Sequence, residues 1–124
     1  MTNMVMLLVA IATIESSNDP AAVGDEGKAI GLYQIRQETI TDVNRVHSTH
    51  YCWPEDARDP YAAAGICARY IIYWCTAQEL VDNADAARIW NGGPHGWKKK
   101  STVKYWYKVE RELIALREKR TGGK

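Results

Sequence analysis

The carboxyl group of Glu15 is the first one in the chain that is placed to do chemistry. It ends an apolar segment, residues 4–14, that we expect to form a buried helix. The negative end of the helix dipole and apolar neighbours both disfavour an ionised carboxylate, so the sequence predicts a raised pKa for Glu15. A carboxylic acid that stays protonated near neutral pH can protonate the leaving oxygen of a glycosidic bond. The plainer interpretation, a helix-terminal glutamate that points into water, is favoured by this segment alone.

Asp25 follows ten residues later and is the second candidate carboxylate. If it faces Glu15 across a cleft, it can act as a nucleophile or stabilise a cation in a retaining hydrolysis. Carboxyl groups about 5 Å apart favour that role, and a wider gap favours an inverting one. The flanking Gly24, Glu26 and Gly27 make a simple turn residue equally plausible. In that case a group of the substrate itself must act in place of a second carboxylate.

The elements that must position these carboxyl groups are predicted to be mostly helical. Apolar periodicity and polar or glycine-rich stops divide the chain without internal repeats. The predicted helices cover residues 3–15, 38–46, 59–74, 84–90 and 102–117. A small β-hairpin or irregular β-lobe is predicted for residues 23–35, and a loop for residues 47–58. The expected fold is therefore α+β and helix-dominated, in one domain of residues 1–124 with a basic, flexible tail from about residue 118.

Four short motifs occur in order along the chain. They are Glu15-Ser16, Gly31-Leu32-Tyr33-Gln34-Ile35, Asn91-Gly92-Gly93-Pro94 and Thr102-x-x-Tyr105-x-x-x-Val109. Each motif alone is weak, but the ordered set is specific. It resembles the lytic transglycosylase and goose-type lysozyme group of the lysozyme superfamily, and the stretches 88–96 and 105–109 are also similar to invertebrate-type lysozymes. The resemblance covers about residues 8–116 and implies a lysozyme-like fold.

The resemblance also implies a role for each matched side chain. Glu15 is then the general acid, and Tyr105 places its hydroxyl group near that acid. Asn91 hydrogen-bonds the substrate or braces Glu15. The cleft is then lined by the second motif, through Gly31, Tyr33, Gln34 and Ile35, with Gly31 letting the backbone approach the sugar closely. For Gln34 and Asn91, hydrogen bonds that brace the loops are an equally good interpretation.

Some features depart from these relatives and leave the sub-branch open. Asp25 falls close to where invertebrate-type lysozymes place their catalytic aspartate, but its spacing to the Gly-x-x-Gln motif is one residue shorter. If Asp25 is only a turn residue, the resemblance to lytic transglycosylases implies that the N-acetyl group or the 6-hydroxyl group of the substrate acts, with a 1,6-anhydro sugar as the product. Trp90 stands where the lytic transglycosylase motif has a tyrosine, and the histidine that invertebrate-type lysozymes carry there is absent. Their dense set of disulfides is missing as well.

The leading functional hypothesis is a muramidase that cleaves the β-1,4 bond between N-acetylmuramic acid and N-acetylglucosamine in peptidoglycan. Hydrolysis is slightly favoured over transglycosylation, and chitin is an alternative substrate because it shares the linkage. A lysozyme-like module that only binds glycan is a hypothesis of another class, but it would not need to retain Glu15. A nucleic-acid-binding protein is disfavoured because no such motif is present and the N-terminal half is acidic.

Charge is unevenly distributed although the formal net charge is only +1. Residues 1–64 carry four Lys and Arg against nine Asp and Glu, whereas residues 65–124 carry twelve against six. This asymmetry can steer the protein toward an anionic wall polymer. The basic triplet Lys98-Lys99-Lys100 is the segment best suited to that contact, although a solvated loop is the favoured interpretation. Trp53 and Trp97 either stack on sugars or pack in loops.

The odd number of cysteines, Cys52, Cys67 and Cys75, excludes a complete disulfide framework. Cys52 can pair with either of the other two, but small buried thiols are the favoured interpretation. No cysteine pair has metal-site spacing, and His47 and His50 are interpreted as loop residues, so no metal or other cofactor is expected.

Residues 4–14 lack a basic leader and are too short to span a bilayer, so they predict a core helix without an export signal. We expect a monomer, without a membrane span, that acts on the bacterial cell wall. It would be a phage or viral endolysin, or a domain excised from an exported protein.

Overall fold

Helix α1 holds Glu15 in its last turn. The computed structural model describes residues 3–122, and α1 spans Met4–Ser16. The Asn3 side chain caps its N-terminus by accepting a hydrogen bond from the Met6 amide, and Ser17 ends it in a left-handed conformation. The helix therefore stops one residue after Glu15, close to the predicted boundary.

A small hairpin follows α1, as predicted. Strand β1 (Val23–Gly24) pairs antiparallel with β2 (Ala29–Ile30), and a short 3-10 helix, Asp25–Gly27, connects them. A further antiparallel bridge joins Ile30 to Ile35. The hairpin therefore brings the segment after Glu15 back toward the start of the next helix.

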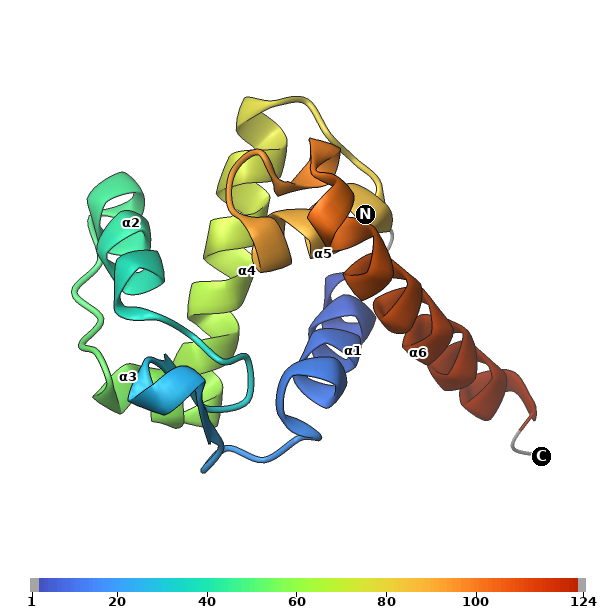
Figure 1. The fold of residues 1–124 in the computed structure, drawn as a ribbon, viewed down its shortest axis with the longest axis horizontal. Coiled ribbons are helices and arrows are strands. Elements are labelled where there is room, and N and C mark those ends of the chain that lie inside the picture. Colours follow the sequence, from blue (N-terminus) through green and yellow to red (C-terminus); the bar gives the residue numbers. More distant parts are fainter. Residues whose placement is uncertain (1–2, 123–124) are drawn as a thin grey trace.

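Five further α-helices complete the described chain. They are α2 (Gln37–His47), α3 (Glu55–Arg58), α4 (Pro60–Ala77), α5 (Asn83–Gly92) and α6 (Val103–Gly122). Helix α4 runs through the middle of the molecule, with α2 and α3 on one side and α1 and α6 on the other (Figure 1). None of the helices in residues 3–122 is both long and apolar enough to cross a membrane.

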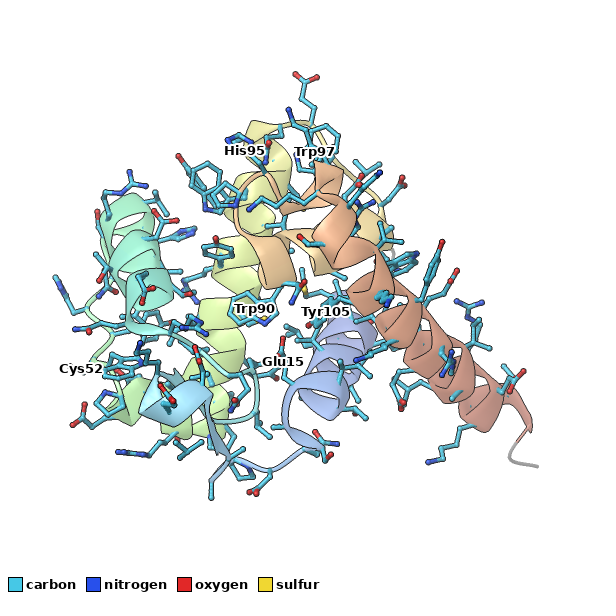
Figure 2. All side chains as sticks on the ribbon, viewed as in Figure 1. Glu15, Cys52, Trp90, His95, Trp97 and Tyr105 are labelled. Atoms are coloured by element: carbon cyan, nitrogen blue, oxygen red, sulfur yellow. The ribbon has the colours of Figure 1, made fainter. Side chains whose placement is uncertain are left out.

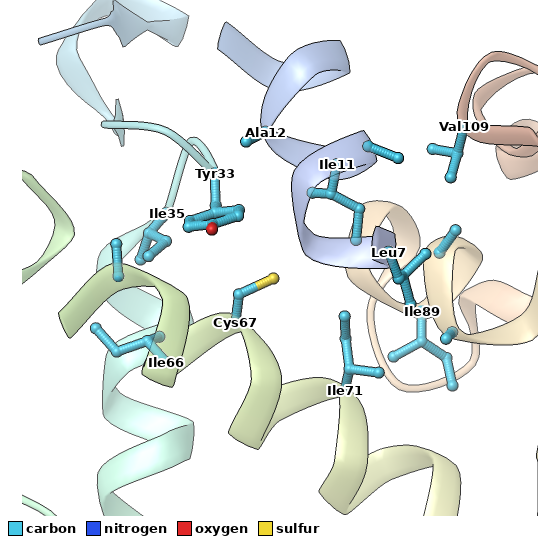
Figure 3. Packing of buried hydrophobic residues seen from close by; sticks show 14 of the residues in the cluster. Leu7, Ile11, Ala12, Tyr33, Ile35, Ile66, Cys67, Ile71, Ile89 and Val109 are labelled. Atoms are coloured by element: carbon cyan, nitrogen blue, oxygen red, sulfur yellow. The ribbon is translucent and has the colours of Figure 1, made fainter. Parts of the chain in front are cut away.

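One hydrophobic cluster lies where α1, α4, α5 and α6 meet. Leu7 and Ile11 of α1 face Ile71 of α4 and Ile89 of α5, with Val109 of α6 closing the far side (Figure 3). Burying these side chains supplies the main driving force for folding. It also fixes α1 against α6, which sets the surroundings of Glu15.

Two predicted boundaries were wrong. The expected loop of residues 47–58 contains α3, whose first-turn acids Glu55 and Asp56 suit the positive end of a helix. The last helix continues to Gly122, so the segment from residue 118 that we predicted as a flexible tail is helical through Gly122. Lys119 and Arg120 are good helix formers, and their charges suit the helix C-terminus.

The cysteines are all free thiols. Cys67 and Cys75 are buried in α4, as predicted, whereas Cys52 is exposed, so the prediction of a buried thiol was wrong for that position. Cys52 lies outside the core because it stands in the loop that leads to α3.

Candidate active site

Glu15 and Tyr105 form the centre of the site. The Tyr105 hydroxyl group donates a hydrogen bond of 2.9 Å to Oε2 of Glu15. The two side chains point toward each other from α1 and α6, and Trp90 of α5 lies beside them (Figure 2). The predicted proximity of Tyr105 to the acid is therefore confirmed.

The pKa of Glu15 is raised above its ordinary value, as the sequence predicted. Burial is the largest cause, while the hydrogen bond from Tyr105 and the positive charge of Arg36 both act to lower it. Burial and the neighbouring Glu15 carboxylate raise the pKa of Tyr105, so its hydroxyl group keeps its proton and remains a donor. The site thus holds a carboxyl group that keeps its proton to a higher pH than an ordinary glutamate, and a neutral partner that orients it.

A pocket of about 310 Å³ opens beside Glu15. It takes its walls from the end of α1, the hairpin, the start of α2 and the end of α5. The residues that line it are Glu15, Asp25, Ala29, Gln34, Arg36, Thr39, Trp90 and Asn91. Four of the predicted site residues, Glu15, Asp25, Gln34 and Asn91, are therefore brought to one cleft.

Asp25 lines this cleft from the turn between β1 and β2. Its backbone has φ of 50°, a left-handed conformation that non-glycine residues seldom adopt. Its carboxylate pairs with the Arg36 guanidinium group, and the two side chains are 48% and 43% exposed. Asp25 is thus both a turn residue and a cleft residue, which combines the two interpretations from the sequence.

Three residues of the second motif do not line the cleft, although the sequence predicted that they would. The Ile35 side chain is fully buried and the Tyr33 side chain is 6% exposed, and both pack in the core. A Cβ atom on Gly31 would lie 2.0 Å from the carbonyl oxygen of Ala57. The glycine, with φ of 82°, is therefore required by contact with the chain near α3 and not by approach to a sugar. The prediction that these three residues line the cleft was wrong because the motif turns inward here.

Gln34 braces its own turn, which is the alternative interpretation of this residue from the sequence. Its amide nitrogen donates to the carbonyl oxygens of Gly31 (3.1 Å) and Ala22 (3.4 Å). Its side chain therefore braces the turn while also lining the cleft. Asn91 differs, because in residues 3–122 no hydrogen bond holds its exposed side-chain amide. A free amide offers both a donor and an acceptor to an N-acetyl group.

Hydrogen bonds tie the motifs to one another. The Ser16 hydroxyl group donates to the Leu32 carbonyl oxygen at 2.8 Å, joining the end of α1 to the second motif. The Trp90 indole donates to the Tyr33 carbonyl oxygen at 3.3 Å. These bonds hold the walls of the cleft on either side of Glu15.

The loop after Asn91 is fixed by buried Thr102. The Thr102 hydroxyl group donates to the Gly96 carbonyl oxygen at 2.7 Å and accepts from Nε of Arg88 at 2.8 Å. Lys99, the middle of the basic triplet, donates to the Gly92 carbonyl oxygen at 2.7 Å. Lys99 thus caps α5, and Nζ of Lys98 lies 5.2 Å from the centroid of the Trp97 ring. Lys98 and Lys100 are both exposed and can contact an anionic polymer.

Trp53 and Trp97 both belong to loop packing. The Trp53 indole donates to the Ile35 carbonyl oxygen at 3.3 Å, and the Trp97 indole donates to Oε1 of Gln78 at 2.9 Å. Both side chains are half-buried, and neither lines the cleft at Glu15. The packing alternative therefore describes them better than sugar stacking at this site.

The cleft is also lined by Arg36, Thr39 and Trp90, which were not predicted from the sequence. Arg36 directly follows the Gly31–Ile35 motif, and its position at the hairpin exit was the available signal. The available signal at Trp90 was its place directly before the third motif, where it stands in for a tyrosine. In the part of the chain that the structure describes, no three His, Cys, Asp or Glu side chains gather in a way that could hold a metal ion.

Two solved structures of similar fold contain lysozymes. A chain in the crystal structure of Aeromonas hydrophila PliI in complex with Meretrix lusoria lysozyme aligns with a TM-score of 0.74 and 27% identity. The crystal structure of Tapes japonica lysozyme aligns with a TM-score of 0.74 and 24% identity. Each alignment covers 86% of this chain and 87% of the matched chain. No curated protein sequence matches the chain.

The fold and the carboxyl group beside the cleft define a lysozyme-type glycosidase or a lytic transglycosylase. The family model of the transglycosylase SLT domain matches residues 2–111, and the chain belongs to that family. The predicted lysozyme-like, helix-dominated fold is confirmed, as is the resemblance on which it was based. Degradation of peptidoglycan is the activity that this family and fold support.

Proposed function

We propose that this chain is a muramidase that hydrolyses the β-1,4 bond between N-acetylmuramic acid and N-acetylglucosamine. Glu15 is the general acid in this proposal. The observation that carries it is the half-buried Glu15 carboxyl group, held by Tyr105 at a cleft that also contains the Asp25 carboxylate. Burial favours the protonated form that a general acid needs.

Glu15 gives up one proton in the first step of the reaction and regains one in the second. Glu15 gives its proton to the bridging oxygen as the bond from that oxygen to C1 of the muramic acid breaks. Asp25, which lines the same cleft, stabilises the positive charge that develops at C1, or bonds to C1. A water molecule then attacks C1 and returns a proton to Glu15, which leaves a reducing end on the muramic acid. Asn91 and Gln34 are placed to hold the sugar while this happens.

Transglycosylation is the second candidate, and the Asp25–Arg36 pair favours it. A carboxylate that already holds a guanidinium group is a weaker nucleophile, because its negative charge is partly neutralised. The 6-hydroxyl group of the muramic acid would then attack C1 in place of water, and the product would be a 1,6-anhydro sugar. The match to the transglycosylase SLT domain supports this route as well.

Mass spectrometry of released muropeptides separates the two routes. Reducing muramic acid ends are expected from the wild type, and anhydro ends would establish transglycosylation instead. Glu15→Gln should lower either activity by about 10²- to 10⁴-fold, the usual contribution of a general acid. Glu118→Gln is the matched control because Glu118 is exposed on α6. Equal cleavage by wild type and Glu15→Gln would contradict the role of Glu15, and no cleavage by either would favour a module that binds glycan without cleaving it.

The same proposal places the protein at the bacterial cell wall as a monomer, in the role of a phage or viral endolysin or a domain of an exported protein. Lys98 and Lys100 would add a salt-sensitive attraction to anionic wall polymers. Size-exclusion chromatography and pelleting with purified walls at low and high salt test these two points.

A further inference from the structure

Arg36 is the one cation among the residues that line the cleft at Glu15. It precedes α2, and its side chain is 43% exposed. The other charged groups of the lining are the carboxyl groups of Glu15 and Asp25. A single guanidinium group therefore carries all of the positive charge that a substrate meets in this pocket.

Most of the hydrogen-bonding capacity of Arg36 is unused. A guanidinium group has five N–H donors in a flat fork. Only the Nη2 group of Arg36 bonds to Asp25, and within residues 3–122 no other hydrogen bond holds this side chain. The rest of the fork has the geometry that suits a carboxylate.

The bond from Arg36 to Asp25 can be broken with little loss of stability. Both side chains are about half exposed, and ion pairs between such groups contribute little to stability. Arg45 and Asp42 form a similar pair further along α2, but that pair lies outside the cleft. The two arginines are thus alike in charge and in having an aspartate partner, and they differ in access to the cleft.

We propose that Arg36 is a specificity-determining residue that binds a carboxylate of the glycan and so favours muramic acid polymers over neutral chitin. The inference rests on the proposed function. N-acetylmuramic acid carries a lactyl ether that ends in a carboxylate when no peptide is attached, and stem peptides carry carboxylates of their own. Chitin has neither. Asp25 competes with the substrate for Arg36, so the cleft binds a carboxylated glycan at the expense of this internal pair.

Binding in a Glu15→Gln background tests the proposal without turnover. The ligands are a peptide-free tetrasaccharide of alternating N-acetylglucosamine and N-acetylmuramic acid, the same tetrasaccharide with its carboxyl groups converted to amides, and the peptide-bearing form. Calorimetric titration at low salt gives the Kd for each. Arg36→Gln should weaken binding of a carboxylated ligand about tenfold, the lower range for a hydrogen bond to a charged group. It should change the Kd of the amidated ligand less than twofold, and Arg45→Gln should change neither.

Two further variants separate direct recognition from a change in cleft charge. Asp25→Asn should tighten binding of the carboxylated ligand, because it removes the competitor for Arg36. Asp25→Asn with Arg36→Gln restores the charge balance, and the carboxylate preference should still be lost. A loss confined to the peptide-bearing ligand would identify a stem-peptide carboxylate, and a loss with the peptide-free ligand would identify the lactyl group.

The outcome distinguishes this inference from the proposed function. Equal losses on carboxylated and amidated ligands, no loss on either, or no binding of any ligand would overturn the role of Arg36. Wild-type cleavage that depends on Glu15 would leave the muramidase proposal intact in each of those cases. Conversely, a carboxylate preference that depends on Arg36, without cleavage by the wild type, would support recognition and contradict catalysis.

Discussion

The Tyr105 hydroxyl group donates a 2.9 Å hydrogen bond to Oε2 of Glu15, although the two residues are 90 positions apart in the chain. This bond stabilises the ionised carboxylate, whereas burial of Glu15 destabilises it. Burial is the larger influence, so the pKa of Glu15 lies above its ordinary value. The pKa of Glu15 is therefore set by two opposing effects, and variants can change each of them in a known direction.

Removing the donor should raise the pKa of Glu15 further. In Tyr105→Phe the burial remains and the hydrogen bond is lost, so we expect the alkaline limb of the pH–rate profile to move to higher pH. The value of kcat should fall about tenfold, because the carboxyl group loses the contact that orients it. Tyr107→Phe is the control, since Tyr107 lies on the same helix and is 56% exposed. An unchanged alkaline limb in Tyr105→Phe would show that the bond does not influence the acid.

Glu15 should destabilise the folded protein at neutral pH. A carboxyl group whose pKa is higher in the folded than in the unfolded state binds more protons when folded. The free energy of unfolding therefore falls as the pH rises from the unfolded-state pKa to the folded-state pKa. Glu15→Gln keeps an acceptor for Tyr105 and removes the buried charge. We therefore expect a higher Tm than wild type at pH 7 and a vanishing difference below the ordinary carboxyl pKa of about 4.5. Thermal unfolding across pH 3–8 measures this, and a variant that is less stable at pH 7 would contradict it.

Gly31 and Gly27 offer a matched pair for backbone effects. Both have positive φ, 82° and 90°, but a Cβ atom on Gly31 would overlap the Ala57 carbonyl oxygen, and one on Gly27 would meet nothing within 4 Å. Gly27→Ala should cost only the left-handed penalty of about 1–2 kcal/mol. Gly31→Ala should cost clearly more, because the hairpin must also move away from α3. Urea unfolding of both variants tests the difference, and equal costs would mean that the contact relaxes freely.

The Thr102 hydroxyl group should stabilise the loop that follows Asn91. Thr102→Val preserves the shape of the side chain but removes the acceptor for Nε of Arg88 and one of two donors to the Gly96 carbonyl oxygen, which keeps its bond from the Lys99 amide. The expected loss of unfolding free energy is about 1–3 kcal/mol. Ser101→Ala, at an exposed neighbouring position, should change it by less than about 0.5 kcal/mol. A comparably stable Thr102→Val protein would show that water replaces the lost bonds.

Local chemistry explains why part of the site was predictable. The position of Glu15 follows from an apolar helix that ends in a carboxylate, and the ordered motifs placed Tyr105 near it. Arg36 could not be found in this way, because its pairing with Asp25 depends on how the hairpin folds back onto the start of α2. The motif glycine Gly31 was assigned to substrate approach because its true neighbour, Ala57, lies in a segment that we expected to be a loop.

The fold shows the same division between local and long-range information. Apolar periodicity and stop signals located the helices within a few residues, except for α3, which lies in a segment that was expected to be a loop. The end of α6 was missed because continuing a helix through Lys119 and Arg120 costs little, so no local signal stops it at Arg117. The inward orientation of Tyr33 and Ile35 depends on packing against α4, which no short motif specifies.

The bond that joins α6 to α1 also sets an order of events during synthesis. Glu15 leaves the ribosome long before Tyr105, and the apolar face of α1 has no α6 to pack against until the C-terminal part of the chain has emerged. A ribosome-bound fragment that ends before Val103 therefore carries the acid without the hydroxyl group that orients it. The acid thus gains its orienting partner only after α6 has been made and packs against α1.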